Sequence, residues 1–140
     1  MEKEFVPYKI ALELKDLGFD EPCFGLFENG KIGYNFSTSQ GIVTPIAYRT
    51  NSKFVKNILS KNDCTAPTYS QSSRFFRKKG YDVNVKKESI DLYFGFYWTG
   101  AAWVIVGEGK TYEEAELETI KKLIEIVKNK ELYECGNNPI

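Results

Sequence analysis

The chain has 140 residues and none of them is histidine, an absence that removes several kinds of chemistry at once. Histidine is the usual general base beside a serine or cysteine nucleophile, and it is a common zinc ligand. The sequence also lacks a Cys-x-x-Cys pair, which is typical of structural zinc sites. We therefore expect no bound metal, no other cofactor and none of the hydrolase mechanisms that depend on histidine.

Cysteine is also sparse, and the three cysteines lie far apart at Cys23, Cys64 and Cys135. An odd number of cysteines without an export signal argues against a disulfide framework. The charged amino terminus has no apolar segment typical of a signal peptide, and nowhere do about 18 apolar residues run together. The sequence indicates a soluble, cytoplasmic protein with free thiols and without membrane attachment.

Hydrophobic residues make up 42% of the chain and aromatic residues 15%, which is too much for a disordered protein. With no internal repeat, the length predicts a single domain over residues 1–140. The formal net charge is zero, but residues 49–87 hold ten basic and only two acidic side chains. The segments before and after, residues 1–48 and 88–140, both carry an excess of acidic side chains.

The clearest predicted element is a helix from Thr111 to Lys130. It begins with a capping box, in which the Thr111 hydroxyl accepts from the Glu114 amide and the Glu114 carboxylate accepts from the Thr111 amide. Acidic side chains gather at its amino end and lysines at its carboxyl end, which suits the helix dipole. One broad side repeats at helical spacing and carries Ala115, Thr119, Ile120, Leu123, Ile124, Ile126 and Val127.

This helix closes a predicted α-β-β-β-α unit over residues 66–130. A second capping box, Thr68-Tyr69-Ser70-Gln71, opens a helix that ends at Lys79 and the left-handed candidate Gly80. Three strands are expected after it, from Tyr81 to Lys87, from Ile90 to Trp98 and from Ala101 to Val106. Residues 131–140 show no pattern and are predicted to form a loose tail.

Residues 5–65 are predicted to contain a helix, a hairpin and a short second helix. Asn29-Gly30 is the strongest hairpin signal and predicts a two-residue type I′ turn, while Gly18 is expected to end the first helix. The expected elements are a helix from Pro7 to Leu17, strands from Cys23 to Phe27 and from Lys31 to Phe36, a loop from Ser37 to Gly41, an edge strand from Ile42 to Tyr48 and a helix from Asn51 to Ser60. The expected fold class is α+β, with helices packed on an antiparallel sheet.

The order α-β-β-β-α, with Gly107-Glu108-Gly109-Lys110-Thr111 leading into a helix that carries Ala115, resembles the double-stranded-RNA-binding domain over about half of the chain. In that family the run after Gly-x-Gly is Ser-Lys-Lys-x-Ala-Lys, whose lysines hold RNA phosphates. Here Tyr112, Glu113 and Glu116 stand in the three lysine places. The resemblance therefore implies the topology and speaks against that mode of RNA binding, which depends on positive charge.

From about Phe5 to Lys130, the chain also resembles a family of small uncharacterised proteins of bacteriophages and prophages. The segments that carry this resemblance are Leu17 to Gly25, Ala66 to Gln71, Phe75 to Arg77, Tyr112 to Glu116 and Lys122 to Ile126. The resemblance implies a phage-related accessory protein in the cytoplasm, and it supplies no catalytic residues.

The candidate contact residues lie in the basic segment. Positive charge with interleaved aromatic rings is typical of nucleic-acid binding, and helical spacing places three of these cations away from Tyr69 and Phe76. The same charges also fit an acidic protein partner, or a solvated surface that balances the acidic C-terminal helix. The candidates are Arg74, Arg77, Lys78 and Lys79 on the predicted helix and Lys86 and Lys87 on the strand after it.

Two further patterns suggest enzyme chemistry and also have simpler explanations. Gly107 to Thr111 is similar to the end of a phosphate-binding P-loop, but Val104 stands where that loop needs a glycine, so a tight strand-to-helix turn explains it. Glu108 or Glu116 would be the working carboxylates of an enzyme. A carboxylate that reaches water past Ala115 is the simpler explanation of Glu116.

Large side chains alternate along the predicted central strand and point to both of its faces. One face must pack against helices, and the other needs the amino-terminal hairpin or a partner, because large exposed apolar patches are uncommon on monomers. We therefore expect a non-catalytic binding module. Its partner would be an unknown protein, a nucleic acid or a second copy in a homodimer.

Overall fold

The computed structural model describes residues 2–23, 25–34, 36–39, 42–45, 50–51 and 62–136. These residues form helices and antiparallel sheets, so the predicted α+β class is confirmed. The chain divides into two compact units, Met1–Gln71 and Ser72–Ile140. No helix among the described residues combines the length and the apolar character needed to cross a membrane.

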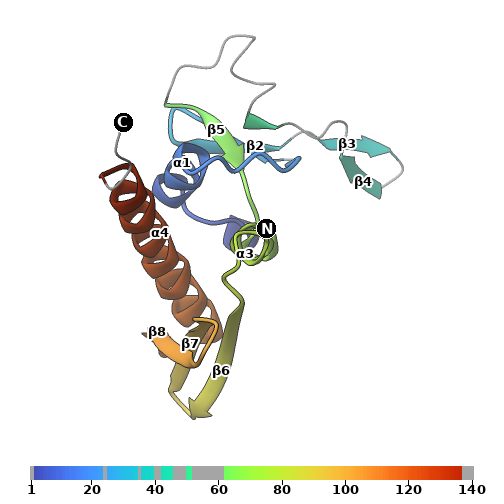
Figure 1. Ribbon diagram of the computed structural model, residues 1–140. Coiled ribbons are helices and arrows are strands. Elements are labelled where there is room, and N and C mark those ends of the chain that lie inside the picture. Colours follow the sequence, from blue (N-terminus) through green and yellow to red (C-terminus); the bar gives the residue numbers. More distant parts are fainter. Residues whose placement is uncertain are drawn as a thin grey trace. The chain divides into compact units, whose positions relative to one another are not determined.

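The first unit contains a helix, a three-stranded sheet and a two-stranded sheet (Figure 1). Its elements are η1 (Glu2–Glu4), α1 (Tyr8–Asp16), β1 (Gly25–Glu28), β2 (Lys31–Tyr34), β3 (Phe36–Ser39), β4 (Ile42–Pro45) and β5 (Cys64–Ala66). The larger sheet has the antiparallel order β2-β1-β5, and α1 packs on β5. The Lys15 ammonium donates to the Asp63 carbonyl at 2.7 Å, which ties α1 to the residue before β5.

Local signals set the end of α1. Gly18 has a φ of 97°, and its amide donates to the Lys15 carbonyl at 3.0 Å. The Phe19 amide donates to the Leu14 carbonyl at 2.9 Å, which completes the two hydrogen bonds of a Schellman motif. Leu17 is the C-cap residue, so the prediction for this helix is confirmed at the end that Gly18 determines.

The predicted hairpin is also confirmed. Asn29 and Gly30 have φ values of 52° and 77°, and Glu28 pairs with Lys31 on either side of them. Two consecutive positive φ values in a two-residue loop define the type I′ turn. The Asn29 amide donates to Asp63 Oδ1 at 3.0 Å, so this turn is also tied to the residue before β5.

Three predictions for the first unit need correction or remain open. Ser37–Ser39, predicted as loop, belong to β3, because pairing with β4 supplies ladder hydrogen bonds that local composition does not reveal. The strand β5 was not predicted, since it is three residues long, is buried throughout and shows no alternation. The predicted helix from Asn51 to Ser60 lies outside the described residues except for Asn51, as do residues 46–48 of the predicted edge strand.

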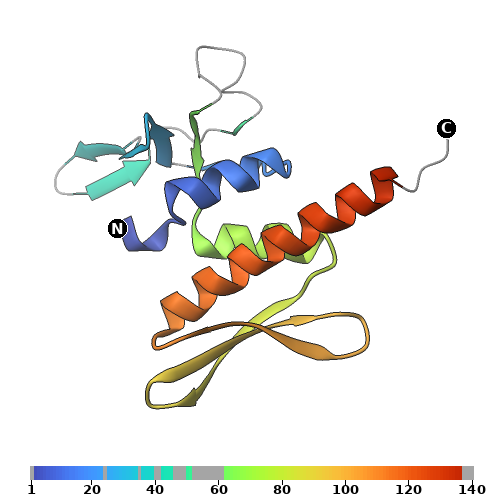
Figure 2. The same ribbon diagram turned by 90° about the vertical axis from the view of Figure 1, so that its left-hand side faces the viewer.

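The predicted α-β-β-β-α order is present. All of it belongs to the second unit except the first turn of its first helix, because the boundary between the units falls between Gln71 and Ser72. The elements are α3 (Tyr69–Lys78), β6 (Val83–Ser89), β7 (Leu92–Trp98), β8 (Trp103–Gly109) and α4 (Tyr112–Gly136). The strands form an antiparallel sheet in the order β6-β7-β8. Figure 2 shows α4 running diagonally across one face of this sheet.

Both predicted capping boxes are present, with one difference. In α3 the Gln71 amide donates to Thr68 Oγ1 at 3.2 Å, and the Thr68 amide donates to Gln71 Oε1 at 3.0 Å. In α4 the Glu114 amide donates to Thr111 Oγ1 at 3.2 Å. The Glu114 carboxylate, however, accepts from the Lys110 amide at 2.8 Å. The predicted partner was the Thr111 amide, so the observed donor lies one residue earlier in the chain.

The end of α4 and one turn differ from the predictions. The helix continues to Gly136, so residues 131–136 are not part of a loose tail, and residues 137–140 lie outside the described range. No proline or glycine interrupts the chain between Lys130 and Gly136, so nothing local ends the helix earlier. Ile90, predicted in a strand, lies in the turn between β6 and β7 with 85% of its surface exposed.

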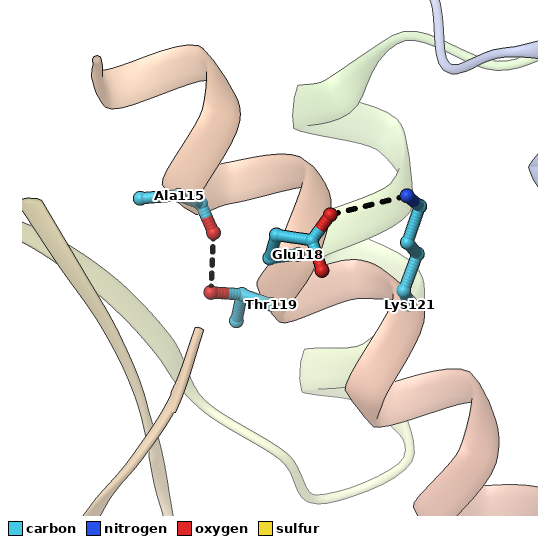
Figure 3. A network of polar contacts seen from close by, with 4 residues as sticks. All are labelled: Ala115, Glu118, Thr119 and Lys121. Atoms are coloured by element: carbon cyan, nitrogen blue, oxygen red, sulfur yellow. Dashed lines mark hydrogen bonds and ion pairs between the residues drawn. The ribbon is translucent and has the colours of Figure 1, made fainter. Parts of the chain in front are cut away.

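Three glycines let α4 lie directly against the sheet. A Cβ atom at Gly95 would be 1.6 Å from Thr119 Oγ1, and one at Gly107 would be 2.5 Å from the same atom. A Cβ atom at Gly109 would be 2.5 Å from the Cβ of Glu114. Figure 3 shows Thr119 on the side of α4 next to the strands, where its hydroxyl donates to the Ala115 carbonyl at 2.7 Å. Helix and strand backbones therefore approach more closely than side chains would allow.

Candidate interaction surface

One face of the β6-β7-β8 sheet is covered by α4. Gly95 faces α4, and successive side chains on a strand point to opposite sides, so Tyr93 and Tyr97 face the same way. The ring of Tyr93 lies 6.4 Å from that of Tyr112 at the start of α4. The ring of Tyr97 lies 6.1 Å from that of Tyr81. The covered face of β7 thus combines a glycine with two tyrosines.

The opposite face of the sheet is apolar, and we call it the open face. The strands β7 and β8 contribute large side chains that contact one another on this face. The ring centres of Phe94 and Phe96 lie 6.3 Å apart, and those of Trp98 and Trp103 lie 5.5 Å apart. None of them is fully buried. The open face consists of Leu92, Phe94, Phe96 and Trp98 from β7 and Trp103 and Ile105 from β8.

The charges beside the open face balance one another. Lys86 pairs with Phe94 from the β6 side, and Glu108 pairs with the same residue from the β8 side. One cation and one carboxylate therefore flank the centre of the face, while Asn84 pairs with Phe96 in the next row. Asp82 lies opposite Trp98 on the same side, so the charges beside the face are not net positive. An apolar surface without net positive charge beside it suits another apolar surface better than it suits a polyanion.

The two edges of the sheet differ sharply. On β8, Trp103, Val104 and Ile105 expose 49%, 40% and 53% of their surfaces, and this strand segment carries no charge. On β6, the exposed residues include Lys86, Lys87 and Glu88. Both strands have an irregular register, after Lys87 on β6 and at Val106 on β8, so the edges differ in charge. Charges and bulges protect an edge strand against pairing with another chain. The β8 edge lacks such charges.

The predicted basic residues do not form one surface. Arg74, Arg77 and Lys78 are exposed on α3, whose buried side carries Phe76, as helical spacing predicts. Lys79, just after α3, lies 4.0 Å from the Glu131 carboxylate of α4 and 5.2 Å from the centre of the Phe75 ring. Part of the basic segment is therefore balanced by the acidic C-terminal helix, one of the alternatives that the sequence left open.

The other two candidates lie on β6 and point in opposite directions. Lys86 pairs with Phe94 and belongs to the side of the open face. Lys87 pairs with Tyr93, which faces α4, so its side chain points to the other side of the sheet. The structure thus groups Arg74, Arg77 and Lys78 on one helix and separates Lys86 from Lys87.

The cysteines of the first unit are buried free thiols. Burial raises the pKa of Cys23 to about 12, and the pKa of Cys64 to about 12 as well. A thiol that stays protonated is a poor nucleophile and a poor metal ligand. This confirms free thiols at these two positions.

The carboxylates singled out by the sequence are not brought together. Glu108 lies between Gly107 and Gly109, which face α4, so its side chain points away from the helix that carries Glu116. Glu116 is half-buried and reaches solvent. Among the described residues, no cluster of three or more acidic or cysteine side chains could hold a metal ion.

The P-loop-like sequence forms a tight strand-to-helix turn. Gly107 and Gly109 belong to β8, Lys110 and Thr111 connect it to α4, and Thr111 caps the helix. The Lys110 amide, which a P-loop would offer to a phosphate, donates to the Glu114 carboxylate. The simpler explanation of this segment is therefore the one that the structure supports.

Comparison with protein-family models, with curated proteins and with solved structures finds no match for this chain. The sequence placed large rings on both faces of the central strand, but it did not identify Trp103, Val104 and Ile105 as exposed residues of an edge strand. Four consecutive apolar residues beginning at Trp103, in a strand at the edge of a sheet, are the signal that could have found them.

Proposed function

We propose that this chain is a non-catalytic interaction module that binds a protein through the open face. The observation that supports this function is the set of six large apolar side chains on a face that α4 leaves uncovered. An antiparallel sheet with one covered face usually presents polar residues on the other. Contiguous exposed apolar residues with a polar rim are typical of protein-binding sites.

A protein partner is favoured over nucleic acid for this face because Lys86 and Glu108 balance each other beside it. Neutralised phosphates supply most of the affinity for nucleic acid, and a face without net positive charge offers none of that energy. The proposal includes a phage-related accessory role in the cytoplasm, which is supported by the resemblance of Leu17 to Gly25 and Ala66 to Gln71 to small phage proteins.

Affinity capture from a nuclease-treated bacterial lysate tests this function. The open-face variant Phe94→Thr/Phe96→Thr removes two rings and keeps β-branched residues that suit a strand. The matched control is Lys122→Ala, which changes an exposed residue of α4. We expect the parent and the control to retain the same protein partner after nuclease treatment, and the open-face variant to lose it. Capture that is unaffected by the open-face variant would contradict the proposal.

A second candidate function is nucleic-acid binding by α3. It is favoured by one observation, the exposure of Arg74, Arg77 and Lys78 on the side of α3 away from the buried Phe76. Guanidinium and ammonium groups on one side of a helix can contact successive phosphates. Lys79 would contribute less, because it lies beside the Glu131 carboxylate.

Electrophoretic retardation of DNA and RNA at low salt tests this candidate. If α3 binds duplex DNA, the variant with alanine at Arg74, Arg77 and Lys78 should bind more weakly to all sequences. Each lost phosphate contact lowers the salt slope by about one unit, so the triple variant should have a slope shallower by about two to three. A parent protein that retards neither single- nor double-stranded nucleic acid would eliminate this function.

A further inference from the structure

The outer edge of β8 has the features of a strand that pairs with another strand. In the described part of the chain, β8 has β7 as its strand neighbour and no hydrogen-bonded strand on its other side. Trp103 and Ile105 are exposed on the open face, and Val104 between them is exposed on the opposite face. A partner lying flat on the open face would leave Val104 uncovered, whereas a strand lying beside β8 covers both sides.

The hydrogen bonds show which backbone groups of β8 point outward. The Trp98 amide donates to the Asp82 carbonyl at 3.0 Å, toward the β6 side of β7. Trp103 lies opposite Trp98, so the backbone amide and carbonyl of Trp103 point away from β7 to the outer edge. The backbone amide and carbonyl groups of successive residues point to opposite edges of a strand. Those of Ile105 therefore point outward like those of Trp103, and those of Val104 point toward β7.

The position of α4 leaves room beside this edge. The first turn of α4 lies over Gly109 at the end of β8, and Lys130 near the other end lies 5.9 Å from the centre of the Tyr81 ring, just before β6. The helix therefore crosses from the β8 side to the β6 side, as Figure 2 shows. This crossing leaves Val104 with 40% of its surface exposed even though it is on the face that α4 covers elsewhere.

We propose that β8 pairs antiparallel with β8 of a second copy of this chain, with Val104 opposite Val104 of the second copy. In this register Trp103 of each copy lies opposite Ile105 of the other, and the outward amides and carbonyls of both residues form reciprocal hydrogen bonds. Tryptophan opposite a β-branched residue is a favourable cross-strand pair. In this symmetric pair, each of the three exposed apolar residues of the edge lies opposite an apolar residue of the other copy.

A second copy fits this edge because no charge is brought against a like charge. In the register centred on Val104, the paired segment from Trp103 to Ile105 is uncharged, and Glu108 lies outside it, beyond the irregularity at Val106. The result is a six-stranded sheet whose two open faces form one larger apolar surface. This inference rests on the proposed function, because it assigns the same sheet to binding and makes the dimer the form that binds the other protein.

Proline substitution separates pairing from folding. Ile105→Pro removes an amide that points to solvent in the single chain, so it breaks no hydrogen bond of the β6-β7-β8 sheet. Val85→Pro is the matched control, since Val85 lies opposite Gly95 and its amide points outward at the other edge. We expect sedimentation between about 1 and about 100 μM to show a dimer for the parent and for Val85→Pro, and a dissociation constant at least about tenfold weaker for Ile105→Pro.

Disulfide cross-linking tests the register and does not depend on the proline variant folding. Residues opposite each other in a non-hydrogen-bonded pair have Cα atoms about 4.5 Å apart, which a disulfide can bridge. Val104→Cys in a Cys135→Ser background should therefore form a dimer on mild oxidation. Glu108→Cys in the same background should not, because this register separates the two copies of residue 108 by about 25 Å.

The outcomes separate this inference from the proposed function. A parent protein that stays monomeric over the whole concentration range overturns the dimer, as does an Ile105→Pro protein that is folded and dimerises like the parent. Cross-linking through Glu108→Cys and not through Val104→Cys also overturns it. A monomer that still captures a protein through Phe94 and Phe96 would support the proposed function and contradict the dimer. A dimer that captures no protein would support the dimer and contradict the proposed function.

Discussion

The two faces of the β6-β7-β8 sheet differ in an unexpected way. Glycines lie under α4, where large apolar side chains are the rule, and large apolar side chains lie on the face away from the helix. The face under α4 presents glycines at Gly95, Gly107 and Gly109; Thr119 of α4 lies against the first two, and Glu114 lies against Gly109. The open face carries large side chains, among them Phe96, none of which is fully buried. The difference teaches that α4 is held by close backbone approach, and that the largest rings of β7 are available for other contacts.

Close approach stabilises through many small contacts. A helix that lies directly on strand backbone gains dispersion contacts along its whole length, and each is lost if a methyl group holds the surfaces apart. Thr119 is fully buried, and its hydroxyl is satisfied because it donates to the Ala115 carbonyl. The covered face should therefore tolerate added volume poorly, while the open face should tolerate the loss of volume.

The largest expected effect is that of Gly95→Ala. The new methyl group would lie 1.6 Å from Thr119 Oγ1 and 2.9 Å from Thr119 Cβ, so α4 must shift. We expect the free energy of unfolding to fall by about 3 kcal/mol, the upper part of the range for overpacking, as measured by urea denaturation.

Gly33→Ala is the matched control, because nothing lies within 4 Å of a Cβ atom at Gly33, which is also in a strand. It should change stability by less than about 0.5 kcal/mol. Thr119→Ala combined with Gly95→Ala should recover part of the loss, because it removes the atom that clashes first. If Gly95→Ala is as stable as the parent, α4 does not lie on the sheet in this way.

The second effect concerns the open face in the isolated protein. Truncating a fully buried phenylalanine costs about 3 to 5 kcal/mol, but Phe94 and Phe96 are half-buried. Phe94→Thr/Phe96→Thr should therefore cost only about 2 kcal/mol in total by the same measurement. A loss of more than about 6 kcal/mol would mean that these rings belong to a closed core, and the comparison between the two faces would fail.

The success of the sequence-based predictions follows from how local each signal is. The turn at Asn29-Gly30 and the helix ends at Gly18 and Gly80 were predicted correctly, because each needs a positive φ that a few neighbouring residues determine. The starts of α3 and α4 were found through Thr68 and Thr111 for the same reason.

The parts that the sequence did not determine depend on distant contacts. Alternation along β7 identified a strand with two apolar faces, but only the position of Thr119 on α4 decides which face is covered. The strands β3 and β5 depend on partners elsewhere in the chain. The basic candidates were grouped by their closeness in sequence, whereas the pleat sends Lys86 and Lys87 to opposite sides of the sheet.

The smallest expected effect is that of Thr111→Ala, at the start of the helix that covers the sheet. The Thr111 hydroxyl accepts from the Glu114 amide at 3.2 Å, and losing this cap should lower the free energy of unfolding by about 1 kcal/mol. Thr111→Ser keeps the hydroxyl and should be nearly as stable as the parent. Because Thr111 lies at the carboxyl end of β8 and does not contribute to the open face, protein capture by Thr111→Ala should match that of the parent. A Thr111→Ala protein of unchanged stability would show that the carboxylate of Glu114, which accepts from the Lys110 amide at 2.8 Å, is sufficient to start α4.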